Sequence, residues 1–332
     1  MKKLVSLGEL LMRLSCEDAL RFSQVNNFKV VYGGSEANVL ITAANFGLET
    51  EFLSVLPEND LGKSAIHDLR NNNVGLNHIK FEGQRLGLYF LETGAINRPG
   101  KIIYDRENSA FSQIEPEWFD WDEIFKDCNW FHWSGITPAI SAKAAQVCMH
   151  AVKVAKSKGI KISGDLNFRG NLWQYKGANP EETMTKLVGQ TDVLLAGAYA
   201  CNQFFNIKDI QNNHELSKAL IKKFPSLEKI AITNREELNA SHHKWSADLF
   251  TGSKLLSSIE YNIYPIVDRV GAGDSFMGAL IYGLQHFKEQ KALDFATAAS
   301  CLKHAIVGDF NRVSKEEVLE LIEGDGSGRT KR

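Results

Sequence analysis

The sequence lacks the features of several specialised classes of protein. No apolar run approaches the ~20 residues that a membrane-spanning helix needs, and a formal net charge of −2 gives no strong field to attract nucleic acid or an anionic membrane. The two lysines after Met1 lead into a short apolar strand and not into a secretory signal. The five cysteines are scattered, and no two have the spacing of a metal or redox site: Cys16, Cys128, Cys148, Cys201 and Cys301. We therefore expect a cytoplasmic protein with reduced cysteines, without a metal centre of its own and without nucleic-acid or membrane partners.

Two common phosphate-binding motifs are also missing. Gly-Lys-Ser/Thr occurs nowhere, which excludes a Walker-type loop. A dinucleotide fingerprint is excluded as well, because Phe276 stands where its third glycine would be. The histidine pair His242-His243 is interpreted as part of a solvated loop and not as a ligand pair.

Strand-like runs alternate with amphipathic helical stretches for most of the 332 residues, enough for one large domain with a small appendage or for two domains. The predicted strands are 4–7, 51–56, 130–132, 161–165, 193–195, 229–233 and 264–267. The predicted helices are 37–46, 61–72, 139–158, 182–188, 214–223, 275–286, 292–306 and 315–322. This alternation predicts an α/β fold with three layers, in which helices cover both faces of a mostly parallel sheet. Ligands should bind beyond the carboxyl ends of the strands, where Asp165, Asp274 and the turn at Gly33 can meet.

Two segments break the alternation. Residues 28–32 are strand-like, and 87–92 with 101–106 look like a hairpin joined through Arg98-Pro99-Gly100. Residue alternation places Ile102, Tyr104 and Arg106 on one face of the second strand. A polar and aromatic face on an extra hairpin suggests a lid over a site, and the alternative is a surface hairpin without function.

The most informative segment is the glycine-rich turn Gly271-Ala272-Gly273-Asp274, between a predicted buried strand and a predicted helix. Backbone amides of such a turn at a helix N-terminus form an anion site suited to phosphate. A carboxylate beside that site would repel phosphate, unless Asp274 takes a proton from the hydroxyl that attacks it. The alternative is that Asp274 only caps the helix.

A second glycine turn, Gly33-Gly34, precedes an apolar helix that carries Asn38 one turn in. An amide offers both a donor and an acceptor, which suits sugar hydroxyls. The alternative is a strand–turn–helix junction capped by Ser35.

Together these segments resemble the signatures of the PfkB (ribokinase-like) sugar kinases. Asp268-Arg-Val-Gly-Ala-Gly-Asp274 matches the C-terminal signature with Arg269 in place of Thr, and Gly33-Gly34 with Asn38 matches the N-terminal one. The resemblance runs from about residue 4 to 322. It implies a ribokinase-like three-layer sandwich in residues 1–322, with a small β-sheet lid from about 9–32 and 86–107. We expect residues 323–332 to be a flexible polar tail.

Within that family the chain looks most like the 2-keto-3-deoxygluconate kinases, in segments 8–11, 87–90, 103–106, 165–169 and 303–311. The catalytic group implied is Asp274, Gly271, Ala272, Gly273 and Arg169. The substrate-binding group implied is Gly8, Glu9, Gly33, Gly34, Asn38, Tyr89, Tyr104, Arg106, Asp165, Asn167 and Asp309. The nucleotide-binding group implied is Thr233, Arg235, Gly271, Gly273, Lys303 and His304.

Several of these assignments have alternatives. Arg169 can hold the sugar acid or steady the transferring phosphate, and Arg106 can form a salt bridge with Asp105 or Glu107. Asp309 can be part of a plain loop after a helix. A guanidinium suits a carboxylate substrate, so we expect phosphorylation of the terminal hydroxyl of 2-keto-3-deoxy-D-gluconate. The alternatives are a neutral sugar such as fructose or ribose, or a sugar-binding protein with impaired transfer.

The resemblance implies ATP and Mg²⁺ as cofactors, leaves open whether a monovalent cation is needed, and implies a homodimer or dimer-based oligomer through the lid. One departure stands out. Many members of the family carry Asn-x-x-Glu at the strand end where this chain has Ala196 to Tyr199, with no acid until Asp209.

Overall fold

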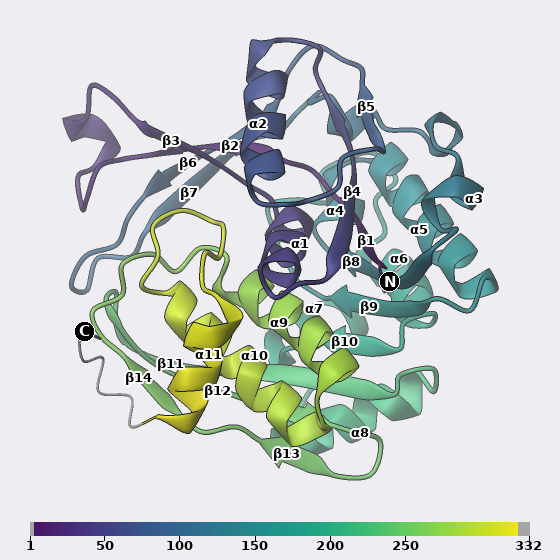
Figure 1. The fold of residues 1–332 in the computed structure, drawn as a ribbon, viewed down its shortest axis with the longest axis vertical. Helices are drawn as coiled ribbons and strands as arrows, with labels where there is room; N and C mark the ends of the chain where they lie inside the picture. Colours follow the sequence, from purple (N-terminus) through teal and green to yellow (C-terminus); the bar gives the residue numbers. More distant parts are fainter. Residues whose placement is uncertain (1–2, 325–332) are drawn as a thin grey trace.

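The computed structural model describes residues 3–324 as an α/β protein with two sheets (Figure 1). Ten strands form the large sheet, in the order β13-β12-β11-β10-β9-β8-β1-β4-β5, and β14 pairs with β12. All pairs from β11 to β5 are parallel, and those of β12 with β11, β13 and β14 are antiparallel. These strands are β1 (Lys3–Leu7), β4 (Glu49–Leu56), β5 (Ile79–Phe81), β8 (Cys128–Ser134), β9 (Lys161–Asp165), β10 (Val193–Leu195), β11 (Lys229–Asn239), β12 (His242–Phe250), β13 (Leu255–Ser257) and β14 (Tyr261–Ile263).

Helices pack on both faces of this sheet, because its strands alternate between two apolar cores. In β4, Phe52 and Leu56 belong to one core, whereas Leu53 and Val55 belong to the other. The first core is shared with α1 (Ser35–Asn45), α2 (Asp60–Asn71), α9 (Ala272–His286), α10 (Glu289–Lys303) and α11 (Lys315–Glu323). The second faces α3 (Trp121–Ile124), α4 (Thr137–Ile140), α5 (Ala142–Ser157), α6 (Pro180–Val188), α7 (Ala198–Phe205) and α8 (Asn213–Lys223). Among residues 3–324, no helix is long and apolar enough to cross a membrane.

The second sheet, called the lid sheet below, extends to one side of the main body (Figure 1). Its order is β3-β2-β6-β7, from β2 (Leu11–Ser15), β3 (Lys29–Gly33), β6 (Gly87–Glu92) and β7 (Lys101–Asp105). The predicted hairpin is confirmed, since β6 and β7 pair antiparallel. Register aligns Val31, Arg13, Tyr89 and Tyr104 in one row across the sheet, which defines its inner face.

Several predicted elements are wrong in detail. Residues 264–267 are not a buried strand: Tyr264 is 69% exposed and Val267 48% exposed. Pro265 has no N–H for a ladder, and the amides of Val267 and Asp268 instead donate to the carbonyl of His304.

The histidine pair does not lie in a loop. His242 and His243 begin β12, and His243 is fully buried, because the β11–β12 hairpin continues well past Thr233. The predicted helix 139–158 is two helices, separated at Ser141, whose hydroxyl accepts from the amide of Ala144 and starts α5. Helix α7 and the short strands β5, β13 and β14 were not predicted. Most of the predicted tail, from residue 325 on, lies outside the described residues.

Candidate active site

A cavity of about 580 Å³ lies between the carboxyl ends of the parallel strands and the inner face of the lid sheet. Nearly all of the predicted site residues line it: Glu9, Gly33, Gly34, Asn38, Tyr89, Tyr104, Arg106, Asp165, Asn167, Arg169, Thr233, Arg235, Gly271, Ala272, Gly273, Asp274, His304 and Asp309. Gly8 and Lys303 do not line it. Gly8 packs against Glu36, where a β-carbon would lie 2.3 Å from the carboxylate.

The glycine-rich turn starts α9 directly, three residues earlier than predicted. Gly271 has a φ of 81°, and a β-carbon there would lie 2.1 Å from the carbonyl oxygen of Asp309, so only glycine fits. A β-carbon on Gly273 would meet no atom within 4 Å. Because the first amides of a helix have no partner within it, those of Gly273 and Asp274 remain free to bind an anion at the cavity wall, whereas that of Ala272 donates to the carbonyl of Arg269 at 3.4 Å.

Asp274 is held by two side chains from the start of α1. Its Oδ1 accepts from the Ser35 hydroxyl at 2.9 Å, and its Oδ2 accepts from the Asn38 amide at 2.7 Å. It makes no helix-capping bond, since the N-cap is Gly271, so the alternative of a pure cap is wrong. Burial raises the pKa of Asp274, although the hydrogen bonds from Asn38 and Ser35 act against the rise. The carboxylate therefore has the position and the raised basicity of a general base.

Asp165 is the last residue of β9, and Arg169 lies in the loop that follows. Burial and the nearby charge of Asp274 raise the pKa of Asp165 to about 7. Its Oδ1 accepts from the amide of Asn167, whose side chain reaches Ser35 at 3.2 Å. The exposed Arg169 guanidinium bonds only to the carbonyl of Phe168, at 3.0 Å. No carboxylate in residues 3–324 lies within ion-pair distance of it, which leaves its charge available to an anion.

Arg106 has a partner that the sequence did not indicate. Its Nε bonds to Oε2 of Glu9 at 2.6 Å, and both side chains are buried. Neither Asp105 nor Glu107 is that partner, because Asp105 pairs with Arg85. The other oxygen of Glu9, Oε1, is buried on the cavity wall without a hydrogen-bond partner. An unsatisfied buried acceptor is costly, so Glu9 is ready to accept from a ligand hydroxyl.

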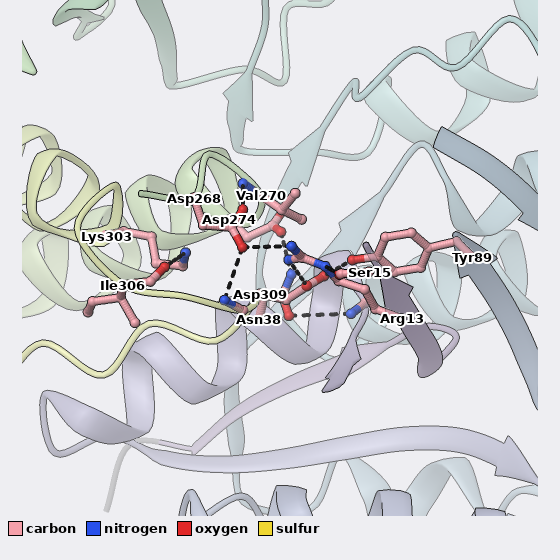
Figure 2. Close-up of polar contacts among 12 residues, drawn as sticks. Arg13, Ser15, Asn38, Tyr89, Asp268, Val270, Asp274, Lys303, Ile306 and Asp309 are labelled. Carbon is pink, nitrogen blue, oxygen red and sulfur yellow. Dashed lines mark hydrogen bonds and ion pairs between the residues drawn. The ribbon is translucent and has the colours of Figure 1, made fainter. Parts of the chain in front are cut away.

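Sequence analysis missed a second buried ionic group, shown in Figure 2. Arg13 of β2 bonds to Asp268 at 2.7 Å and to Asp309 at 2.9 Å, and Tyr89 donates to the other oxygen of Asp309 at 2.6 Å. Gly33 makes room for this group, since a β-carbon there would lie 2.0 Å from Asp309. Asp309 is therefore no plain loop residue. The sequence did contain a signal for this group. Arg13 is a charged residue in a short apolar strand, and residue alternation places it on the inward face of that strand.

In the part of the cavity that carries the residues predicted to bind nucleotide, His304 and Trp245 meet edge to face at 5.6 Å, and Thr233 and Arg235 line the same cavity. Burial lowers the pKa of His304 to about 4, so the ring is neutral at pH 7. Lys303 does not line the cavity. It is fully buried and donates to the carbonyl of Ile306 at 3.1 Å, as Figure 2 shows.

The strand end at Ala196 has no acidic group. Gly197 is the N-cap of α7 and offers no side chain, and Tyr199 is 69% exposed and edge-on to Phe168 at 5.7 Å. Within residues 3–324, no three His, Cys, Asp or Glu side chains gather in a way that could hold a metal ion.

Comparisons of the sequence and of the fold with known proteins both match carbohydrate kinases. The profile of the pfkB family carbohydrate kinases matches residues 1–308. A 2-dehydro-3-deoxygalactonokinase of Haloferax volcanii is 27% identical over 328 residues, 98% of each chain. The crystal structure of a 2-dehydro-3-deoxygluconokinase from Thermotoga maritima is 41% identical, with a TM-score of 0.92 over 98% of this chain and 100% of that chain. A fructokinase of Xylella fastidiosa with bound ATP, 22% identical, shares the fold with a TM-score of 0.79 over 97% of this chain and 98% of that one. The predicted ribokinase-like α/β fold is thus confirmed.

Proposed function

The chain belongs to the pfkB family of carbohydrate kinases, and we propose that its substrate is a sugar acid, 2-keto-3-deoxy-D-gluconate. ATP would phosphorylate the terminal hydroxyl, which gives the 6-phosphate. The observation that carries this proposal is that Asp274 and the free amides of Gly273 and Asp274 line one cavity together with Arg169, whose guanidinium has no carboxylate partner in residues 3–324.

The chemistry follows from that arrangement. The oxygen of the sugar hydroxyl attacks the γ-phosphate, and Asp274 accepts the proton of that hydroxyl. Ser35 and Asn38 hold the carboxylate of Asp274 in place. The helix amides stabilise the negative charge that develops on the phosphoryl oxygens. The covering lid sheet keeps water from competing as the acceptor.

Two features support an acidic sugar over a neutral one. Arg169 has no carboxylate partner, and Arg106 uses only its Nε on Glu9, which leaves the outer nitrogens of the fork for a ligand carboxylate. The relatives from Haloferax and Thermotoga are named as kinases of 2-dehydro-3-deoxy sugar acids. The free acceptor Oε1 of Glu9 suits a hydroxyl of the same substrate.

Mg²⁺ fits this site when it enters bound to the phosphates of ATP. It binds mainly through phosphate oxygens and water, which agrees with the absence of a metal-binding cluster in residues 3–324. The pocket carboxylate of Asp165 is the side chain best placed to take a coordinated water. When bound, Mg²⁺ neutralises phosphate charge.

The test is ADP release by the purified protein with Mg-ATP and one candidate acceptor at a time: 2-keto-3-deoxygluconate, its galactonate epimer, gluconate, fructose, ribose or adenosine. Strong turnover with a keto-deoxy acid alone is the expected result. Turnover with fructose or ribose would retain Asp274 as base but refute the acid preference. Calorimetric binding of a sugar without turnover of any acceptor would show a binding protein and refute the kinase proposal.

We also propose that the lid sheet pairs with the lid of a second copy. Its outer face carries a cross-strand row of Val30, Leu14, Phe90 and Ile103, in which Val30 is 52% and Ile103 54% exposed. A contiguous exposed apolar row of this kind is typical of a subunit interface. Light scattering on the purified protein should give a dimer mass or a multiple of it, and a monomer at micromolar concentration would contradict the proposal.

A further inference from the structure

We propose that Arg13 is a positioning residue, which ties the lid sheet to the glycine-rich turn and keeps that turn in its catalytic geometry. This inference rests on the proposed function, because the turn matters only if it receives a phosphoryl group. The evidence is the buried group of Figure 2, in which one guanidinium from the lid strand β2 holds two carboxylates of the main domain. Arg13 is itself only 4% exposed.

The first carboxylate controls the entry to the turn. Asp268 accepts from the amide of Val270 at 3.0 Å with one oxygen, and from Gly308 at 3.0 Å with the other. The second oxygen also receives the guanidinium of Arg13. Val270 is the residue immediately before Gly271. The orientation of the Asp268 carboxylate, which Arg13 fixes, therefore fixes the backbone that leads into the anion site.

The second carboxylate supports the turn from behind. The backbone of Asp309 packs directly against the Cα of Gly271. Its side chain is held between Arg13 at Oδ1 and the Tyr89 hydroxyl at Oδ2. Through Asp268 and Asp309, the residues that lead into the amides are thus tied to β2 and β6 of the lid sheet.

Arg13 also adjusts the charge behind the site. Two carboxylates beside a pocket for phosphate and a sugar acid would repel both ligands. The guanidinium is paired with both carboxylates and neutralises part of their charge. Its planar fork allows it to form a well-aligned hydrogen bond with each of them at once. A lysine, with a single point charge, can serve only one of these carboxylates at full strength.

The experiment compares Arg13→Met and Arg13→Lys with a matched control, Arg98→Met. Arg98 also forms a lid-sheet ion pair with a buried acid, Glu92, and its other hydrogen bond goes to the carbonyl of Ala19, so neither bond reaches the turn. Two measurements are made on each protein: amide hydrogen exchange in peptides that cover residues 266–276, and the separate kcat and KM values with the best acceptor of the wild type.

We expect Arg13→Met to speed exchange in residues 266–276 by about tenfold or more, since a charge-assisted contact is lost. We expect kcat to fall by about tenfold or more with a smaller change in the KM for ATP. Arg13→Lys should lie in between, and Arg98→Met should match the wild type in both measurements. Unchanged exchange and kcat in Arg13→Met, or equal losses in Arg98→Met, would overturn the proposal.

The paired carboxylates complicate Arg13→Met, because an unpaired buried acid destabilises the fold. The double variant Arg13→Met/Asp309→Asn removes one of them. If Arg13 positions the turn, this double variant regains thermal stability but keeps the fast exchange and the low kcat. If the double variant regains thermal stability, slow exchange and the kcat of the wild type, the role of Arg13 is only structural. The exchange measurement does not need an active enzyme, so a wild type that phosphorylates no sugar would refute the proposed function and still decide the role of Arg13.

Discussion

Substitution of Asp274 by Asn tests the proposed base with little disturbance of the fold. The amide has the shape of the carboxylate and still accepts a hydrogen bond from the Ser35 hydroxyl, now 2.9 Å from Oδ1. In that orientation its NH₂ group faces the NH₂ of Asn38 and the bond at 2.7 Å is lost, whereas the amide turned over accepts from Asn38 and donates to the Ser35 hydroxyl. The first orientation costs ~1–3 kcal/mol. That cost is offset in part, since burial already disfavours the charged carboxylate, whose pKa it raises. We therefore expect a shift of the melting temperature of only a few degrees.

The effect on catalysis should be much larger than the effect on stability. General base catalysis contributes ~10²–10⁴ in rate, and tenfold in rate corresponds to about 1.36 kcal/mol. Loss of the base should therefore raise the barrier by ~3–5 kcal/mol. Binding of the sugar should change little, because an amide keeps the local shape and removes no cation from the pocket.

The assay is steady-state ADP release with calorimetry of sugar binding. Glu36→Gln is the matched control: Glu36 is another buried carboxyl of the same cavity, and burial raises its pKa to about 8, so Gln imitates the protonated form present at pH 7. We expect the control to keep most of its turnover while Asp274→Asn loses at least about a hundredfold. Turnover of Asp274→Asn within about tenfold of the wild type would refute the assignment of Asp274 as base.

Two further predictions concern the same wall of the cavity. The Ser35 hydrogen bond acts to lower the pKa of Asp274, so Ser35→Ala should raise that pKa. Because the base must be ionised, the acid limb of the kcat/KM profile should move to higher pH, and an unmoved limb would contradict the mechanism. For Gly273→Ala, the added methyl meets no atom and lies in a helix, so stability should rise by up to ~1 kcal/mol. Because Gly273 lines the cavity beside the proposed phosphate site, the methyl should hinder phosphate there and kcat should nevertheless fall. A protein that is both stabilised and fully active would show that phosphate does not bind there.

Local patterns in the sequence were sufficient for the parts of the site that depend on a few neighbouring residues. The proposed anion site needs a residue with left-handed backbone at position 271, followed by the first amides of a helix. The seven consecutive residues 268–274 indicate both features. Strand alternation alone places Tyr104 of β7 and Arg106, the residue after its last, on the face that lines the cavity. The parallel sheet follows from the alternation of strands with helices.

The errors concern features that depend on residues distant in sequence. Residues 264–267 are apolar enough for a strand, but Pro265 removes a ladder donor, and the segment is held by His304 instead. His243 is buried because the long β11–β12 hairpin packs near His304, which no local pattern reveals. Lys303 matches a nucleotide-site segment in sequence, yet the end of α10 turns its ammonium toward the carbonyl of Ile306. Arg13 could not be assigned, since its partners lie 255 and 296 residues away.

The ionic pairs that the sequence could not reveal would allow an acid-rich cavity to accept the two anionic ligands proposed for it, ATP and a sugar acid. Five carboxyl groups line it: Glu9, Glu36, Asp165, Asp274 and Asp309. Arg106 pairs with Glu9 and Arg13 with Asp309, while Glu36, whose pKa burial raises to about 8, is mostly protonated at pH 7. Burial and the charge of Asp274 raise the pKa of Asp165 to about 7, so a proton resides there about half of the time at pH 7. Asp274 is then the carboxylate without a cationic partner, which is the condition for it to take the proton of the sugar hydroxyl while ATP is bound.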